Sequence, residues 1–150
     1  MQTREWTRDG FTVSTDPARV QLDVVHGFLT KAYWSEGIPR ETVARAIAHS
    51  LPFGVYEGAT QVGFARVVSD YTAIAYVGDV FVLPEWRGRG LSRFVMECML
   101  AHPDLQGLRR WVLLTRDAHG LYEKFGFERI TNPERWMHRW TPNVYGVPKG

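Results

Sequence analysis

Glycine and arginine alternate at the point where an apolar run gives way to a helical pattern. Residues 84–94 read PEWRGRGLSRF, and the preceding run, YVGDVFVL, is almost wholly apolar. A helix beginning here leaves about four backbone N–H groups unpaired, and its dipole adds positive potential at the same end. Gly88 and Gly90 would let the main chain approach a ligand without interference from a Cβ atom. With three arginines on the same turn, the pattern predicts an anion site suited to a pyrophosphate.

The same turn could also be an ordinary glycine-containing loop with solvated arginines, because motifs this short often match by chance. It lacks the Gly-Lys-Ser/Thr ending of a Walker loop. It also supplies only the first half of a dinucleotide-binding G-x-G-x-x-G fingerprint. The turn alone therefore leaves both interpretations open, and the elements around it must decide between them.

The composition indicates one globular domain covering residues 1–150. The chain has 45% hydrophobic and 23% charged residues, which is ordinary for a folded domain. Its 18 basic and 16 acidic residues give a formal net charge of +2, too small to favour a nucleic-acid partner. We expect no membrane association, because no apolar run approaches the roughly 18 residues that span a bilayer.

Cysteine and histidine usage argues against a disulfide or a metal centre. Cys98 is the single cysteine, so no disulfide can form within the chain. The five histidines are scattered, and no pair of them has metal-ligand spacing. The stretch MQTREWTRDG lacks the apolar core of a signal peptide. These features together predict a cytoplasmic protein without a bound metal.

The periodicity of apolar residues predicts a mixed α/β fold, with helices on both faces of one central sheet. A glycine within the long apolar strand, Gly78, predicts a bulge or a close backbone approach. Gly126 is placed to end the last helix, and Trp136, Met137 and Trp140 are candidates for packing in a closing strand. The expected elements are strand 11–15, helix 17–33, helix 40–50, strands 53–57, 61–70 and 73–83, a helix from residue 91, strand 110–115, helix 118–126, and strands 127–130 and 134–140.

Two segments in this order resemble the GNAT N-acetyltransferase superfamily. VFVLPEWRGRGLSRFVMECML is similar to its acyl-CoA-binding segment, a strand ending in V-x-P followed by R/Q-x-x-G-x-G/A and a helix. Val82, Pro84, Arg87 and Gly90 match, whereas Ser92 stands where the family usually has glycine or alanine. About 30 residues later, LYEKFGF resembles the second family signature. The resemblance covers residues 11–140.

The resemblance implies an enzyme that moves an acetyl group from acetyl-CoA directly to a primary amine of a small molecule or peptide. A non-catalytic module that binds acyl-CoA is the alternative, and the chain could form a homodimer. Backbone N–H groups at residues 80–82 could bind the carbonyl oxygen as charge develops on it. The residues assigned to cofactor binding are Val80, Phe81, Val82, Arg87, Gly88, Arg89, Gly90, Leu91, Ser92, Asp117, His119 and Tyr122.

Direct transfer requires two proton movements. An amine with a pKa near ~10 must lose a proton before it attacks, and the departing thiolate leaves more easily when protonated. The resemblance gives the second role to Tyr122, although this ring could simply pack against Phe125 and Phe127. For the base we expect Asp79 or Glu36, with a chain of water molecules as the alternative.

The acceptor is expected opposite the cofactor, beside the loop AYWSEGIP. Tyr33 and Trp34 offer aromatic surface there, and Glu36 could attract a cation; Trp34 could instead cap the core. Asp117 stands near a position where many family members have an asparagine that contacts the pantetheine arm, which puts that contact in doubt. His119 could relay a proton or face solvent at the start of its helix.

Overall fold

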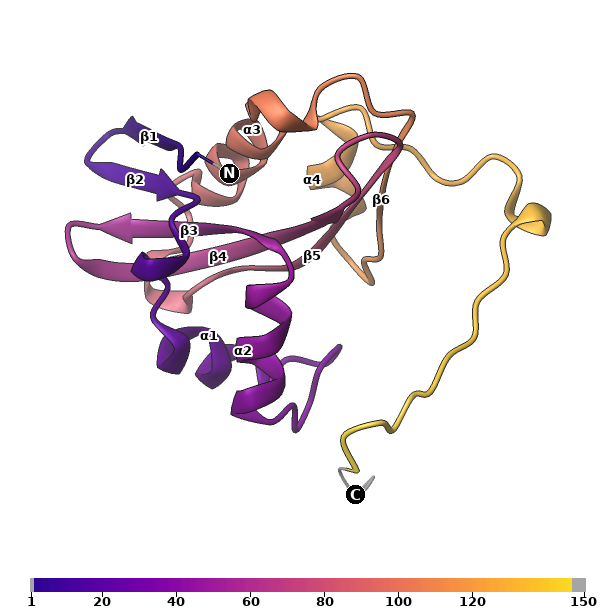
Figure 1. Ribbon diagram of the computed structural model, residues 1–150, viewed down its shortest axis with the longest axis horizontal. Helices are drawn as coiled ribbons and strands as arrows, with labels where there is room; N and C mark the ends of the chain where they lie inside the picture. The colour runs from indigo at the N-terminus through magenta and orange to yellow at the C-terminus, as the bar shows by residue number, and fades with distance from the viewer. Residues whose placement is uncertain (1, 147–150) are drawn as a thin grey trace.

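A six-stranded sheet forms the centre of the computed structural model, which describes residues 2–146 (Figure 1). The strands lie in chain order across the sheet, and each neighbouring pair is antiparallel except the last, which is parallel. The strands are β1 (Glu5–Arg8), β2 (Phe11–Ser14), β3 (Leu51–Glu57), β4 (Thr60–Ser69), β5 (Ile74–Val82) and β6 (Arg110–Leu113).

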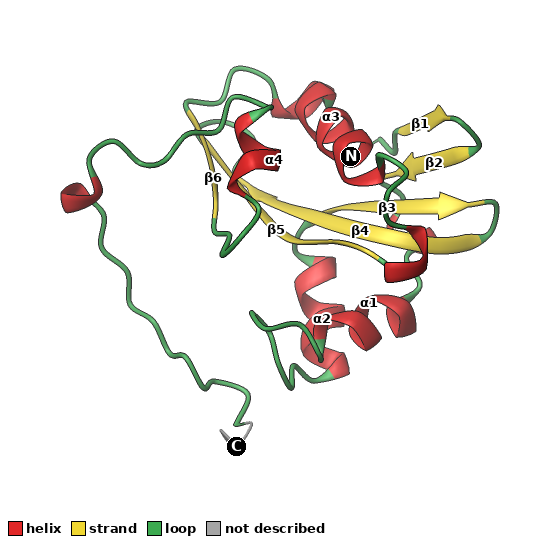
Figure 2. Ribbon diagram, turned by 180° about the vertical axis from the view of Figure 1, so that it is seen from behind, coloured by secondary structure: helices red, strands yellow, loops and turns green. Residues whose placement is uncertain are grey.

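Helices cover both faces of this sheet, as the sequence predicts. α1 (Leu22–Leu29) and α2 (Arg40–Ala48) lie on one face, whereas α3 (Leu91–Ala101) and α4 (His119–Glu123) lie on the other (Figures 1 and 2). The long connection through α3 allows β6 to run parallel to β5, because parallel neighbours need a crossover.

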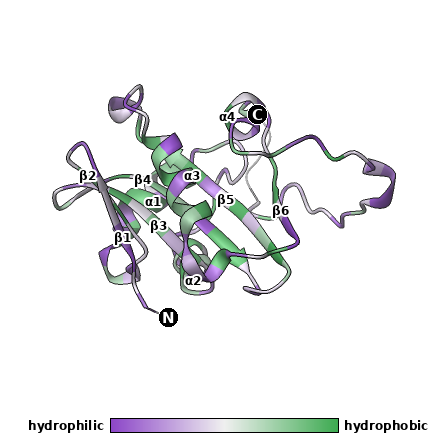
Figure 3. Cartoon of the chain, turned by 90° about the horizontal axis from the view of Figure 1, so that it is seen from above, coloured by the Kyte–Doolittle hydropathy of each residue, from purple (hydrophilic) through white to green (hydrophobic). Residues whose placement is uncertain are grey.

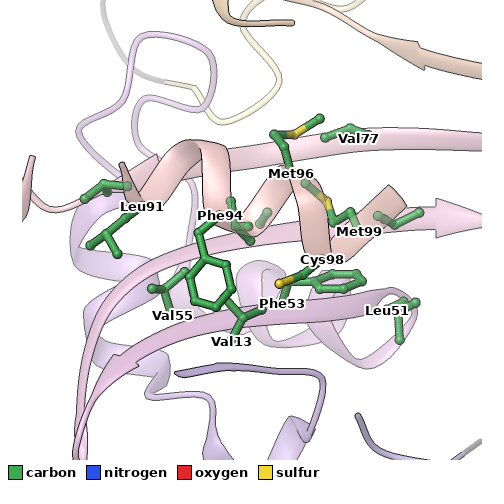
Figure 4. Packing of buried hydrophobic residues seen from close by; sticks show 14 of the residues in the cluster. Val13, Leu51, Phe53, Val55, Val77, Leu91, Phe94, Met96, Cys98 and Met99 are labelled. Carbon is green, nitrogen blue, oxygen red and sulfur yellow. The ribbon is translucent and has the colours of Figure 1, made fainter. Parts of the chain in front are cut away.

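The larger hydrophobic core lies between α3 and the sheet (Figure 4). Side chains along a strand point alternately to its two faces, so Phe53 and Val55 of β3 face α3, while Tyr56 lies on the α1–α2 side. Phe94 and Cys98 belong to the predicted apolar stripe of α3 and are buried against them. A second cluster, which includes Phe64 and Phe81, packs under α1 and α2.

The predicted helix 17–33 is wrong in extent. A 3₁₀ turn covers Pro17–Arg19, and α1 then runs only from Leu22 to Leu29. The break has a tertiary cause: the Gln21 backbone N–H donates to Gln61 Oε1 at 2.7 Å, which holds Gln21 extended. At the other end, the buried Ser35 hydroxyl donates to the Leu29 carbonyl at 2.7 Å. That bond stabilises a turn in place of a continuing helix.

β1 is absent from the sequence-based prediction. Three of its four residues are exposed, so the segment lacks the alternation that predicts a half-buried strand. The remaining residue, Trp6, is half-buried and stacks on Phe53, with ring centroids 6.2 Å apart. Pairing with β2 and the packing of this one ring hold the strand in place.

The two predicted C-terminal strands are also wrong. Residues 127–130 and 134–140 pair with no strand in the described part of the chain. A short 3₁₀ turn, Pro133–Arg135, is followed by extended chain that runs clear of the sheet (Figures 1 and 3). Apolar alternation gives a segment strand propensity, but a strand forms only where another strand satisfies its backbone. β6 likewise ends at Leu113 and is half-exposed, not buried as expected.

Candidate active site

β5 and β6 separate near the middle of β5, which leaves a backbone edge open. Their pairing covers Ile74–Val77 of β5 and ends at Leu113 of β6, whereas β5 continues to Val82. The Leu83 N–H donates to the Val62 carbonyl of β4 at 2.9 Å, so the Val82 carbonyl of the same peptide points away from β4, where it accepts from Arg87 Nε at 3.0 Å. An extended ligand could hydrogen-bond along such an edge in the way an added strand does.

A bulge lies at the point where the two strands separate. The register of β5 against β4 shifts between Phe64 and Arg66, opposite residues 78–81. Asp79 occupies the left-handed region at φ +54°, which is uncommon for a residue with a side chain. Strain of this kind persists where the surroundings hold it and is concentrated at functional sites. The bulge that Gly78 predicts is therefore confirmed, and Asp79 carries its strained conformation.

The glycine-rich turn after β5 presents an open surface at the start of α3. Gly88 and Gly90 have φ of +79° and +75°, and a Cβ atom at either would meet nothing within 4 Å. Gly90 is the N-cap of α3 and provides no side-chain cap for the amides of the first turn. Free amides beside open space suit a phosphate. Arg89 does not point freely at this space, because its guanidinium lies 4.9 Å from the centre of the Trp86 ring.

Asp79 is the centre of a polar network that joins the β5 bulge to the loop after α1. Its Oδ1 accepts from the Trp34 indole N–H at 2.8 Å, and its Oδ2 accepts from Arg66 Nε at 2.6 Å. Arg66 also donates to Ser50 Oγ at 3.0 Å. Both carboxylate oxygens thus have a donor, and the network sets the position of Trp34 over β5.

A cavity of about 210 Å³ lies beside this network, between the sheet and α2. Its lining combines aromatic and aliphatic surface with one charged pair. The side chains around it are Leu29, Trp34, Ser35, Ile38, Thr42, Val43, Ala46, Ile47, Phe64, Arg66, Tyr76, Asp79 and Tyr145.

The other aromatic residue of the loop, Tyr33, reaches the segment between β6 and α4. The Arg116 backbone N–H donates to the Tyr33 hydroxyl at 3.2 Å, and the Arg116 guanidinium lies 3.8 Å from the centre of the Tyr33 ring. Tyr33 and Trp34 meet edge to face, with centroids 5.1 Å apart. The loop after α1 therefore contacts both sides of the gap between β5 and β6.

Tyr122, on α4, is 9% exposed and packs edge to face against Phe127 at 6.0 Å. Burial raises the pKa of its hydroxyl, and the nearby Tyr33 raises that pKa further. The hydroxyl is consequently protonated at neutral pH, as a proton donor must be. The chain turns sharply after the helix at Gly126, φ +89°, which confirms the predicted helix end.

Glu36, Asp117 and His119 take no part in the Asp79 network. Glu36 is exposed and does not line the cavity. Asp117 is exposed beside Arg116, with 3.6 Å between the charged groups. His119 is half-buried at the first position of α4.

Sequence reasoning missed Arg66, Tyr76 and Tyr145. The sequence did contain a sign that Arg66 is functional, because its charge interrupts the apolar run of β4. It contained no such sign for Tyr76, since an aromatic residue in an apolar strand normally belongs to the core. Tyr145 comes from the C-terminal segment and packs against the cluster under α1 and α2.

Within residues 2–146, no group of three His, Cys, Asp or Glu side chains could hold a metal ion. The helices of that part of the chain are all too short or too polar to cross a membrane.

Comparison with known proteins identifies the family of this fold. Residues 48–129 match the family model of the acetyltransferase (GNAT) domain. A Gibberella zeae protein named as an acetyltransferase is 33% identical, over 81% of this chain and 80% of its own length. Serotonin N-acetyltransferase 2 of Oryza sativa is 38% identical over 77% of this chain, a match that spans 62% of the rice protein.

Solved structures agree with that assignment. A crystal structure from Xanthomonas campestris pv. campestris, described as an acetyltransferase of the GNAT family, is 49% identical. It superposes with a TM-score of 0.89 and covers 91% of this chain and 97% of its own. The fold of a Clostridium acetobutylicum acetyltransferase solved with acetyl-CoA is also similar, with a TM-score of 0.61 at 13% identity over 92% of this chain and 94% of its own. The chain belongs to the GNAT acetyltransferase family.

Proposed function

We propose that this acetyltransferase moves the acetyl group of acetyl-CoA directly to a primary amine of a small molecule or peptide. The observation that carries the proposal is the open edge of β5 leading directly into the uncapped start of α3. A pantetheine arm is extended and polar, so it can pair along residues 80–82. A pyrophosphate is compact and anionic, so it fits the amides and the open space at Gly88 and Gly90.

Two groups of residues are assigned to cofactor binding, and the first of them is better supported by its position. Val80, Phe81 and Val82 lie along the separated part of β5, and Arg87–Ser92 form the turn and the first residues of α3. Arg87 contributes by bracing the Val82 carbonyl. Asp117 and His119 lie in the segment that follows β6, where we propose that they flank the pantetheine arm.

Tyr122 is the proposed general acid for the departing thiolate. Two observations support this role. Its hydroxyl is protonated, and it lies near Tyr33, which reaches the gap between β5 and β6. A backbone N–H of residues 80–82 that faces the open edge is the proposed donor to the carbonyl oxygen.

For the base, the geometry favours Asp79 over Glu36, because only Asp79 lines the cavity. Both Asp79 oxygens already accept one hydrogen bond, but each carboxylate oxygen can accept a second. Glu36 and a water chain are the remaining alternatives. The pH dependence of kcat/KM in Asp79→Asn and Glu36→Gln variants separates these three cases.

The proposed acceptor site is the cavity beside Trp34. Its aromatic walls, Trp34, Tyr76 and Tyr145, suit a flat apolar body, and Asp79 suits an ammonium group. The rice relative is named for serotonin, an arylalkylamine, so aromatic amines form the first group of an acceptor screen. Aliphatic diamines, amino sugars and peptide N-termini form the others.

The chain is further proposed to act as one domain in the cytoplasm. Two hydrophobic cores, one on each face of a single sheet, support the assignment of one domain. The single, buried Cys98 is in keeping with a reducing compartment.

The test is release of free CoA thiol from acetyl-CoA with each amine of the screen. Turnover with at least one amine, and mass-spectrometric detection of its acetylated form, would support the proposal. Tight acetyl-CoA binding by calorimetry, with no thiol release across all groups, would favour the alternative of a non-catalytic acyl-CoA-binding module.

A further inference from the structure

The cavity beside Trp34 contains one positive and one negative group, and the two are in contact. Arg66 and Asp79 are the charged side chains among its described lining residues, and Arg66 Nε donates to Asp79 Oδ2 at 2.6 Å. The pair is largely buried, with 21% of the Arg66 side chain and 12% of the Asp79 side chain exposed. The cavity is therefore close to neutral before an acceptor enters.

The guanidinium of Arg66 has free hydrogen-bond donors within the described residues 2–146. A guanidinium carries five N–H donors. Nε donates to Asp79 and Nη1 donates to Ser50 Oγ at 3.0 Å, whereas Nη2 has no partner in that part of the chain. Nη2 and the second N–H of Nη1 form a fork of the kind that binds a carboxylate through two parallel hydrogen bonds. Because Arg66 lines the cavity, a molecule bound there can reach these donors.

A simple amine matches these charges only in part. Its ammonium group would lie against Asp79, whose charge Arg66 already balances, so the complex would hold one uncompensated positive charge. Burying a charge is unfavourable unless the charge is paired. An acceptor with a carboxylate one carbon away from its ammonium group adds no net charge, because the carboxylate pairs with Arg66 while the ammonium group pairs with Asp79. The dipole of such a ligand lies antiparallel to that of the Arg66–Asp79 pair.

We propose that the acceptor is a free α-amino acid with an aromatic or large aliphatic side chain, and that Arg66 binds its carboxylate. This inference rests on the proposed acetyl transfer and specifies its substrate class. Trp34, Phe64 and Tyr76 supply apolar surface for the side chain. The cavity volume of about 210 Å³ equals that of roughly seven water molecules in the liquid, which suits one small molecule. A peptide N-terminus lacks the adjacent carboxylate, because that group is part of an amide.

Acetyl transfer converts such a zwitterion into an anion. The amine nitrogen forms a bond to the acetyl carbon and the carbon–sulfur bond breaks, which yields an N-acetyl amino acid and CoA. The ammonium group loses two protons: one passes to the base and then to solvent, and the other ends on the CoA sulfur. The product no longer carries the positive charge that pairs with Asp79, and its release is favoured for that reason.

The first test compares acceptors that differ at the carboxylate, using release of the CoA thiol. L-Phenylalanine and L-leucine are each measured beside the corresponding carboxamide and the amine that lacks the carboxylate. We expect kcat/KM for at least one amino acid to exceed that of both its analogues by about tenfold or more, in line with the strength of hydrogen bonds to a charged group. The carboxamide keeps the size of the carboxylate without its charge, and it also represents a peptide N-terminus.

This comparison separates failure of the inference from failure of the proposed function. Turnover of the amines or carboxamides with no preference for either amino acid overturns the inference and leaves the acetyl transfer standing. No thiol release with any acceptor overturns both.

The second test replaces Arg66 with lysine, which keeps a positive charge beside Asp79 but lacks the fork. We expect the ratio of kcat/KM between amino acid and carboxamide to fall toward one in Arg66→Lys. Differences in amine pKa cancel, because the same pair of acceptors is compared in both proteins. Arg45→Lys is the matched control: Arg45 is exposed on α2 and does not line the cavity, so its replacement should leave the ratio unchanged. A native ratio in folded Arg66→Lys overturns the assignment of the carboxylate to Arg66.

Discussion

The indole N–H of Trp34 donates to the carboxylate of Asp79 at 2.8 Å, although the two residues are 45 positions apart. This bond joins the loop after α1 to the strained bulge of β5. It connects the two halves of the proposed site, because Trp34 lines the cavity and Asp79 begins the open edge of β5. A change at either residue should therefore be felt in acceptor binding.

We expect Trp34→Phe to raise the acceptor KM while leaving the affinity for acetyl-CoA nearly unaltered. The variant keeps an aromatic ring but loses the hydrogen bond to Asp79, so uniform acceptor binding is lost and not transition-state stabilisation. Steady-state kinetics and calorimetry measure the two quantities. If the variant loses thermal stability and retains its KM, Trp34 is a cap on the core.

Gly90→Ala should weaken acetyl-CoA binding at least tenfold, about 1.4 kcal/mol, because a methyl group would occupy the open space proposed for the pyrophosphate. Gly107→Ala is the matched control. Gly107 has nearly the same φ, +74°, with equally open space, and lies in the loop before β6. Both variants carry similar backbone strain, so a difference in their affinity for acetyl-CoA reports the contact at Gly90. Calorimetry giving equal affinities in the two folded variants would remove the phosphate assignment.

Tyr122→Phe should lower kcat by ~10²–10⁴-fold, the usual contribution of general-acid catalysis, with little change in stability. The ring and its packing against Phe127 remain, and only the hydroxyl is lost. The deficit should shrink with acyl donors whose leaving thiol has a lower pKa, since that thiolate needs less protonation. Tyr71→Phe, at an exposed tyrosine before β5, is the control and should retain full activity.

The pH profile gives an independent check on Tyr122. Its pKa is raised above the ordinary value, so the hydroxyl ionises at a higher pH than an ordinary tyrosine does. Any loss of activity from this group should therefore be centred above the ordinary tyrosine value near ~10. A loss of kcat centred near pH 8 or 9 that disappears in Tyr122→Phe would contradict this assignment.

Tyr56→Phe should stabilise the protein by about 1 kcal/mol. The Tyr56 side chain is 1% exposed, and its hydroxyl is buried with no hydrogen-bond partner among residues 2–146, so replacement removes an unsatisfied polar group. Denaturant unfolding at neutral pH measures the effect. An equally large loss of stability would mean that the hydroxyl has a partner, such as a bound water.

Tyr56 also predicts an alkaline loss of stability. Burial raises its pKa to about 12, while in the unfolded chain it ionises near ~10. Between these values the unfolded state has released the proton and the folded state has not, so the free energy of unfolding falls as pH rises, by up to ~1.4 kcal/mol per pH unit. The slope should be shallower in Tyr56→Phe. Identical slopes in the two proteins would contradict the assignment.

The residues that carry the proposed cofactor site could be located from the sequence. An apolar strand, a turn containing Gly88 and Gly90, and an amphipathic helix are contiguous, so local periodicity and glycine conformation were enough to predict them. Tyr122 was predicted differently, from the resemblance of LYEKFGF to the second GNAT signature. The mixed sheet with helices on both faces followed from the order of these local elements.

Only the tertiary structure decided which distant groups meet. The sequence alone determined neither the partners of Asp79, which are Arg66 and Trp34, nor the cavity beside them, because cross-strand register and loop packing set those contacts. The failures have the same origin. The helix predicted from Pro17 is interrupted because the Gln21 backbone N–H donates to the Gln61 side chain of β4. WMHRW has a strand pattern but pairs with no strand in the described part of the chain. Local sequence specifies propensity, whereas a strand or a site exists only where folding brings its partner within hydrogen-bonding distance.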